Sequence, residues 1–148
     1  MQVSQKALYA LRAVFELAKR YDQGPVKISD IAEAQAIPQR FLEVILSQLK
    51  QAGFLESRRG SDGGYVLSRS PEELTVADVV GFIQGPVGPT ACLIEKSSIN
   101  KCSLYDTCIF KKMWGKIRDA ISKVYDNTTF SDLVKEEGDQ SQPCVIRK

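Results

Sequence analysis

Two short amphipathic segments separated by a proline constrain the fold of this chain most. Residues 27–37 predict a short helix, and we expect Ser29 to be its N-cap. The inward side chains of this helix are Ile31, Ala32 and Ile37. Pro38 then restarts the chain, because proline is favoured at the first position of a helix.

The second segment predicts a helix over residues 39–52, and Gly53 stands at the C′ position where glycine commonly ends a helix. Its inward side chains are Phe41 or Leu42, Ile45, Leu46 and Leu49. Two short helices joined by a tight turn are typical of a helix-turn-helix. Any small helical hairpin has the same spacing, so this pattern alone does not establish DNA binding.

A β-hairpin is predicted directly after these helices. Residues 54–57 and 65–68 are short β-prone runs, and their connection carries Arg58, Arg59 and three glycines. A helix-turn-helix followed by such a hairpin indicates a winged helix. We expect Arg59 to enter a narrow minor groove, where negative potential is concentrated. Taken alone, the two arginines also fit an ordinary solvated loop.

The chain before these segments predicts a core helix over residues 4–20, with Ser4 as its N-cap and residues 22–25 as its end. Its apolar side chains recur at helical spacing: Ala7, Leu8, Leu11, Val14, Phe15 and Ala18.

Downstream of the hairpin, residues 70–73 predict a turn, and Thr75 with Asp78 predicts a capping box that opens another helix. Glycines and prolines in residues 85–89 end that helix and mark the clearest boundary in the chain.

Three of the four cysteines fall within the seventeen residues of the loop that follows this boundary: Cys92, Cys102 and Cys108. The sequence has no recognisable signal peptide and no apolar run of membrane-spanning length, so we expect a cytoplasmic protein with reduced thiols. Clustered cysteines in that setting are more often metal ligands or redox sensors than disulfides. The chain lacks histidine and suggests no nucleophile–base pair, so we do not expect an enzyme. A net charge of +2 means that any DNA-binding basic surface is local.

Residues 109–125 predict a long amphipathic helix whose apolar residues step by three or four positions, as in a coiled coil. These are Trp114, Ile117, Ile121 and Val124. The seam either packs against the head or pairs with a second copy, and we favour pairing because the helix follows a complete small domain. A last short helix is expected over residues 129–134, and the polar tail over 135–148 is expected to be disordered.

This order of elements resembles the Rrf2 family of bacterial winged-helix repressors, which includes IscR, NsrR and RirA. The most specific matches are Phe41–Glu43, Arg59–Gly60 with Gly63–Tyr65, and the cysteine loop. The resemblance implies a mainly α fold with a small β-hairpin wing and a long C-terminal dimerisation helix. The expected regions are a winged helix-turn-helix over residues 1–85, a cysteine-rich loop over 86–108 and a dimerisation region over 109–134.

The resemblance also implies that the three cysteines hold an iron–sulfur cluster, either 2Fe–2S or 4Fe–4S. The five residues between Cys102 and Cys108 match the family, whereas the nine after Cys92 are closer to the RirA type. Lys111 and Leu8 occupy the positions of the family's known fourth ligands, so that ligand stays open between an oxygen donor, a small molecule and the fourth cysteine. A reduced structural trio and a thiol–disulfide switch are the alternatives to a cluster.

Base reading is expected from the start of the second helix, where helix-turn-helix proteins meet the major groove. Arg40 suits guanine and Glu43 suits cytosine, whereas hydroxyl and ammonium groups elsewhere fix position on phosphates. The predicted DNA-binding residues are Ser4, Lys6, Tyr9, Pro38, Gln39, Arg40, Glu43, Ser47, Arg58, Arg59, Gly60 and Gly64.

We therefore expect a homodimeric transcription regulator, acting as a repressor, that binds double-stranded promoter DNA and senses iron, redox state, nitric oxide or iron–sulfur supply. One rival is a cluster-free member of the family that regulates cysteine or sulfur metabolism through thiol chemistry or a protein partner. Residues 83–86 favour this rival, and the cysteine trio counts against it. The other rival is an interaction module or an iron–sulfur electron carrier without a DNA role.

Overall fold

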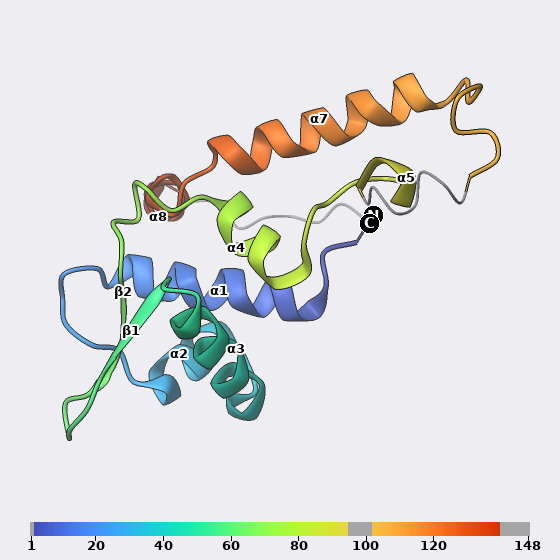
Figure 1. Ribbon diagram of the computed structural model, residues 1–148. Helices are drawn as coiled ribbons and strands as arrows, with labels where there is room; N and C mark the ends of the chain where they lie inside the picture. The colour runs from blue at the N-terminus through green and yellow to red at the C-terminus, as the bar shows by residue number, and fades with distance from the viewer. Residues whose placement is uncertain (1, 95–101, 140–148) are drawn as a thin grey trace, which may run out of the picture.

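The computed structural model describes residues 2–94 and 102–139. Its elements are α1 (Gln5–Lys19), α2 (Ile28–Gln35), α3 (Gln39–Gln51), β1 (Leu55–Arg58), β2 (Gly64–Leu67), α4 (Val76–Gln84), α5 (Ala91–Ile94), α7 (Lys111–Asn127) and α8 (Phe130–Asp139). Figure 1 shows α1 across the middle of the molecule, with α2, α3 and the β1–β2 hairpin below it and α4 and α7 above it. The predicted fold class, mainly α with a hairpin wing, is confirmed. None of the helices in the described ranges has the length and apolar character to cross a membrane.

The central position of α1 follows from its small, fully buried side chains. Ala7, Ala10 and Ala13 have no exposed surface, so α2, α3, α4 and α8 can all pack closely around this helix. Ser4 caps it as predicted, because its hydroxyl accepts a hydrogen bond from the backbone N–H of Ala7 over 3.1 Å.

The predicted Ser29 cap is wrong, because α2 begins earlier, with Lys27 at its N-cap. The backbone carbonyl of Lys27 accepts hydrogen bonds from the N–H groups of Asp30 and Ile31 over 3.1 and 3.2 Å. Ser29 lies inside the helix, where its hydroxyl donates to the Asp30 carboxylate over 3.4 Å. Ile28 packs against the core from the first helical position, which draws the helix start toward the N-terminus.

A tight turn joins α2 to α3. Ala36 adopts the left-handed conformation with φ of 51°, and Ile37 is buried immediately after it. Pro38 occupies the N-cap of α3 rather than the predicted first helical position. Leu42, not Phe41, is the inward residue: it has no exposed surface, whereas Phe41 is 47% exposed. The two helices form the predicted helix-turn-helix.

The hairpin is fixed to the loop before α2. β1 and β2 pair antiparallel, with Arg58 opposite Gly64. The backbone N–H and carbonyl of Tyr65 both pair with Val26 over 2.9 Å. A side chain at Gly64 would collide with the Val26 carbonyl, which explains why glycine stands there. The helix-turn-helix and the wing are therefore parts of one rigid head.

The start of α8 fastens the end of α7 to this head. Phe130 is fully buried, and its backbone N–H donates to the carbonyl of Leu74 over 3.0 Å. Thr129 and Asp132 cap α8 reciprocally: the Thr129 hydroxyl accepts from the Asp132 N–H over 3.1 Å, and the Asp132 carboxylate accepts from the Thr129 N–H over 3.2 Å.

The end of α8 corrects the predicted boundary. The helix continues through residues 135–139, which the composition had suggested were disordered. A salt bridge of 2.8 Å between Lys19 Nζ and Glu137 Oε2 joins its later part to α1. This contact between distant parts of the chain is not visible in local composition. Residues 140–148, which include Cys144, lie outside the described residues.

Candidate DNA-binding face and cysteine region

The solvent side of α3 carries the residues predicted to read DNA. Pro38, Gln39, Arg40, Glu43 and Ser47 are all exposed. The side-chain amide of Gln39 donates to Glu43 Oε1 over 3.3 Å, one turn away. The buried opposite side of the helix holds this face outward. The structure therefore presents the predicted reading residues together on one surface.

The first turns of α1 lie beside this surface. A hollow of about 330 Å³ separates the two helices and is lined by Gln5, Lys6, Tyr9, Phe41, Val44 and Ile45. Lys6 is exposed and Tyr9 is half-buried. The Ser4 hydroxyl already accepts the capping hydrogen bond, and the Ser4 N–H donates to the side chain of Gln84 over 2.8 Å. The O–H group of Ser4 therefore remains as its only donor for a phosphate.

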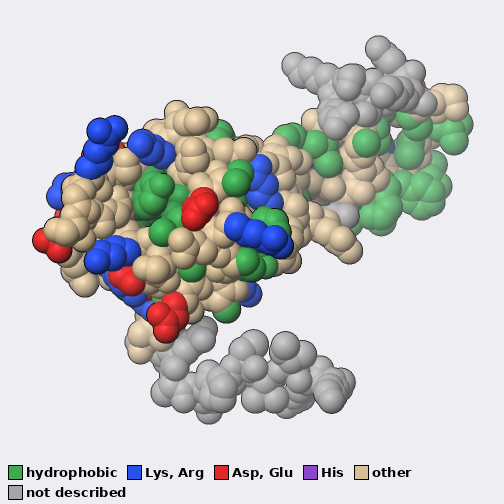
Figure 2. Space-filling view, turned by 90° about the horizontal axis from the view of Figure 1, so that it is seen from below, with side chains coloured by type: hydrophobic (Ala, Val, Ile, Leu, Met, Phe, Trp, Pro, Cys, Tyr) green, Lys and Arg blue, Asp and Glu red, His purple; other side chains and the backbone are tan. Residues whose placement is uncertain are grey.

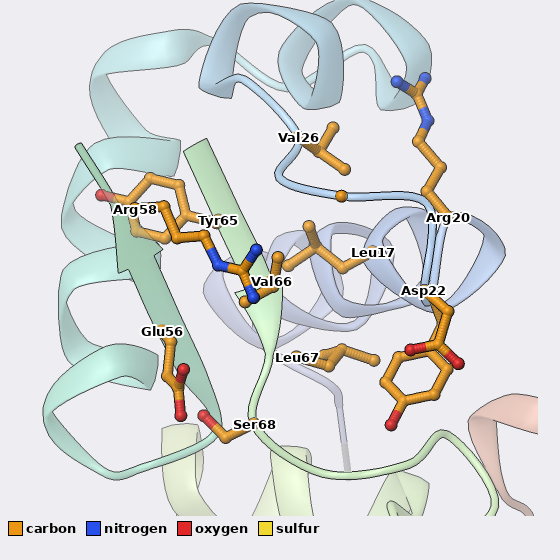
Figure 3. Close-up of a pocket in the computed structure, with 12 residues that line it drawn as sticks. Leu17, Arg20, Asp22, Val26, Glu56, Arg58, Tyr65, Val66, Leu67 and Ser68 are labelled. Carbon is orange, nitrogen blue, oxygen red and sulfur yellow. The ribbon is translucent and has the colours of Figure 1, made fainter. Parts of the chain in front are cut away.

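The two arginines of the wing, Arg58 and Arg59, lie in different surroundings. Arg58 ends β1 and lines a hollow of about 380 Å³ between the wing and the loop after α1. Figure 3 shows Glu56 and Arg58 on the β1 side of this hollow, with Arg20 and Asp22 across it. Arg59 follows the strand at the exposed hairpin turn.

Gly60 continues this turn with φ of 114°, a conformation that favours glycine. A glycine at the turn lets the hairpin tip stay narrow around Arg59. The geometry suits Arg59, more than Arg58, for insertion into a groove.

The predicted dimerisation seam is only partly covered. Trp114, Ile117 and Ile121 are half-buried, whereas Val124 is 61% exposed. The helix packs on α4 and α5. An apolar hollow of about 430 Å³ beside it is lined by Gln2, Val3, Val87, Ala120, Ile121, Val124 and Tyr125. Part of the seam packs within the chain, and part stays open to a partner.

The described cysteines come from two segments on either side of residues 95–101. Cys92 is half-buried on α5, with its Sγ 3.4 Å from the hydroxyl oxygen of Thr90. Cys102 is exposed, and Cys108 is half-buried shortly before α7. All three thiols are free. Free thiols are the donors that iron–sulfur clusters take.

The three cysteines that the structure describes have the side-chain chemistry of cluster ligands, but they are not brought together as a metal site. Within residues 2–94 and 102–139, no three Cys, Asp or Glu side chains are assembled as a metal site. Lys111, at the position of a family fourth ligand, holds its ammonium 3.6 Å from the centroid of the Tyr105 ring. The donor chemistry suits a cluster, but the described residues do not preassemble one.

Residues beyond the predicted set also shape this face. Val44 is 55% exposed on α3, between positions that were predicted to contact DNA. Glu16, a carboxylate in the core, binds Arg20 and Gln35 and so joins α1 to α2. Val44 was not predicted, although helical periodicity places it on the outer side of α3 and would have been sufficient to identify it. Arg20 stands one turn after Glu16 on the same helix, but no local pattern identifies the second partner, Gln35.

The fold and the exposed face of α3 define a winged helix-turn-helix transcription regulator. The sequence model of the Rrf2 family, described as an iron-dependent transcriptional regulator, matches residues 3–136. The chain belongs to the Rrf2 family, as its sequence motifs predicted.

Its relatives include regulators of two kinds. The transcriptional regulator CymR of Bacillus subtilis is 33% identical over 141 residues, covering 95% of each chain. The structure of CymR, called the global cysteine regulator, matches with a TM-score of 0.76 over 92% of this chain and 98% of that one. The regulator IscR of Pectobacterium atrosepticum is 31% identical over 93% of this chain and 81% of its own length. The structure of T. potens IscR matches with a TM-score of 0.76 at 29% identity, over 97% and 93% of the two chains. These relatives are transcription regulators, not enzymes.

Proposed function

We propose that two copies of this chain bind promoter DNA through α3 and the wing and that the cysteine region transmits a signal to them. The exposed row of Gln39, Arg40 and Glu43 on a rigidly buttressed α3 is the observation that carries the DNA-binding role. Phosphate contacts come from Lys6 and Tyr9 on α1. Arg59 at the wing turn enters the minor groove.

Dimerisation through α7 follows from the open part of its seam. Val124 and the apolar hollow beside it lie on a helix with no fully buried residue. A second copy covering this surface places two α3 helices on one duplex, as required for a pair of half-sites. The chain acts in the cytoplasm, where its cysteines stay reduced.

The signal has two candidate forms. Family membership and three free thiols support an iron–sulfur cluster held by Cys92, Cys102 and Cys108. A bound cluster supplies chemistry that responds to oxidants, nitric oxide or iron availability. The similarity to CymR over nearly the full chain supports the second form, a cluster-free regulator of cysteine metabolism. In that form the same thiols, or a protein partner, report the cell's sulfur status.

The iron and sulfide content of protein purified without oxygen separates the two forms. The cluster form gives visible absorption with stoichiometric iron and sulfide, and Cys92→Ser, Cys102→Ser or Cys108→Ser abolishes all three signals. Cys144→Ser tests the open fourth position. Loss of the cluster in that variant identifies Cys144 as the fourth ligand, and its retention leaves an oxygen donor or a small molecule.

Colourless protein that binds duplex DNA supports the cluster-free form. Gel-shift assays against genomic fragments test the DNA-binding role independently of the cofactor. If the protein shifts no DNA fragment at low salt, the proposed DNA-binding function is wrong. An interaction module or an electron carrier would then remain.

A further inference from the structure

Val44 is an apolar residue that the packing of the head does not explain. Its side chain is 55% exposed. The inward side of α3 is already complete, formed by the buried residues Leu42, Ile45, Leu46 and Leu49. A role for Val44 therefore has to be sought on the outer surface of the helix.

Helix geometry places Val44 among the residues of the proposed reading face. At 3.6 residues per turn, Val44 lies one turn after Arg40 and slightly less than one turn before Ser47. All three side chains are exposed. An α-helix that enters the major groove along this face brings Val44 to the edges of the bases. Apolar side chains in that groove contact the 5-methyl group of thymine.

The surroundings of Val44 are complementary to a DNA strand. Val44 and Phe41 line the hollow between α1 and α3, together with the exposed Lys6. The guanidinium of Arg40 lies 4.8 Å from the centroid of the Phe41 ring. Cations beside a small apolar surface match phosphates beside thymine methyl groups. Figure 2 shows the face that carries α2, α3 and the wing, where apolar side chains lie among Lys, Arg and some acidic side chains.

We propose that Val44 is a specificity-determining residue that contacts a thymine methyl group in each half-site of the DNA. This inference rests on the proposed DNA-binding function. Covering one methyl-sized group is worth ~0.8 kcal/mol, which corresponds to about fourfold in affinity for one half-site. Contacts of Arg40 and Glu43 select other bases by hydrogen bonding, so the methyl contact adds a separate element of sequence preference.

Deoxyuridine substitution tests this contact directly, because uracil lacks only the methyl group. DNA duplexes that bind the full-length chain are first selected from a randomised library at a fixed salt concentration. Each thymine of the recovered half-site is then replaced by deoxyuridine, and affinities are measured for the wild type and for Val44→Ala. We expect one position at which the replacement weakens wild-type binding about fourfold per half-site. Val44→Ala, whose shorter side chain covers less of the methyl group, should distinguish the thymine duplex from the uracil duplex less than the wild type does.

The outcomes separate this inference from the function on which it rests. If duplexes are retained but no thymine is sensitive to loss of its methyl group, the Val44 contact is absent and the regulator remains. The contact is likewise absent if Val44→Ala keeps the same sensitivity as the wild type. Failure to retain any duplex overturns both proposals. The circular dichroism spectrum of Val44→Ala verifies that the exposed substitution has not unfolded α3.

Discussion

The side-chain amide of Gln35 donates a hydrogen bond to Oε2 of Glu16 over 2.8 Å, joining the end of α2 to a carboxylate inside the head. Glu16 is only 3% exposed, and its other oxygen accepts a hydrogen bond from Nε of Arg20 over 2.8 Å. Lys19 Nζ lies 3.9 Å from Oε2. Because α2 leads directly into α3, this carboxylate helps to set the orientation of α3.

Replacing Gln35 by alanine is expected to destabilise the head by about 1 kcal/mol, because the buried Glu16 carboxylate loses one hydrogen-bond donor while Arg20 and Lys19 remain beside it. The midpoint of urea unfolding measures the change. Gln51→Ala is the matched control, since Gln51 is exposed at the end of α3. If both variants unfold at the same urea concentration, Glu16 does not depend on Gln35.

Replacing Arg59 by alanine is expected to weaken binding to a cognate duplex about tenfold at fixed salt, within the ~1–3 kcal/mol typical of one specific arginine contact. Fluorescence anisotropy measures the affinity. Lys112→Ala removes the same charge from an exposed position on α7, across the molecule from α3 and the wing (Figure 1). Equal affinities for the two variants would exclude the wing from binding.

Replacing Val124 by glutamate is expected to convert the dimer to a monomer, because a charge would be buried in the apolar seam without a partner. Sedimentation velocity measures the change in mass. Val124 is 61% exposed within one chain, so the substitution should hardly change the unfolding midpoint of the monomeric chain. Lys123→Glu, at an exposed neighbouring position, changes the charge by two units instead of one and is therefore a stricter control for the added negative charge. A dimer that survives Val124→Glu at the same concentration would place the interface elsewhere.

Acid is expected to loosen the start of α8. The hydrogen bonds from the side chain and backbone of Thr129 lower the pKa of Asp132 below its ordinary value of 3.8. A carboxylate with a lowered pKa contributes stability above that ordinary value, and the contribution is lost as the pH falls through the lowered pKa. Asp132→Asn keeps a capping oxygen but does not titrate. Thermal unfolding between about pH 7 and pH 2 should therefore depend less on pH in the variant; an unchanged pH dependence would contradict this.

Several features of the fold could be predicted because their physics is local. Ser4 and the Thr75–Asp78 pair satisfy helix N–H groups within a few residues of themselves, and both caps were predicted correctly. Gly53, with φ of 80°, ends α3 where an L-residue would be strained. The order of helices, turn and hairpin, together with the wing motif, was sufficient to predict the family.

Other features depend on contacts between distant residues. Ser29 is a good cap by local propensity, but burial of Ile28 starts α2 earlier and leaves Ser29 inside the helix. Phe41 and Leu42 are adjacent and both apolar, so the sequence pattern does not distinguish them. The packing of α3 on α1 places Leu42 inward and Phe41 outward. The part of α8 beyond Val134 contains Glu137, which forms a salt bridge with Lys19, more than a hundred residues earlier in the chain.

The sequence by itself determined a winged helix-turn-helix followed by free cysteines and an amphipathic helix, because caps, glycines and apolar periodicity act over short distances. Tertiary structure decided which apolar residues remain outside. Val44 is exposed because other residues fill the inner side of α3, and Val124 is exposed because α7 packs on the rest of the chain only through part of its seam. These two exposed valines mark where DNA and a second copy are proposed to bind.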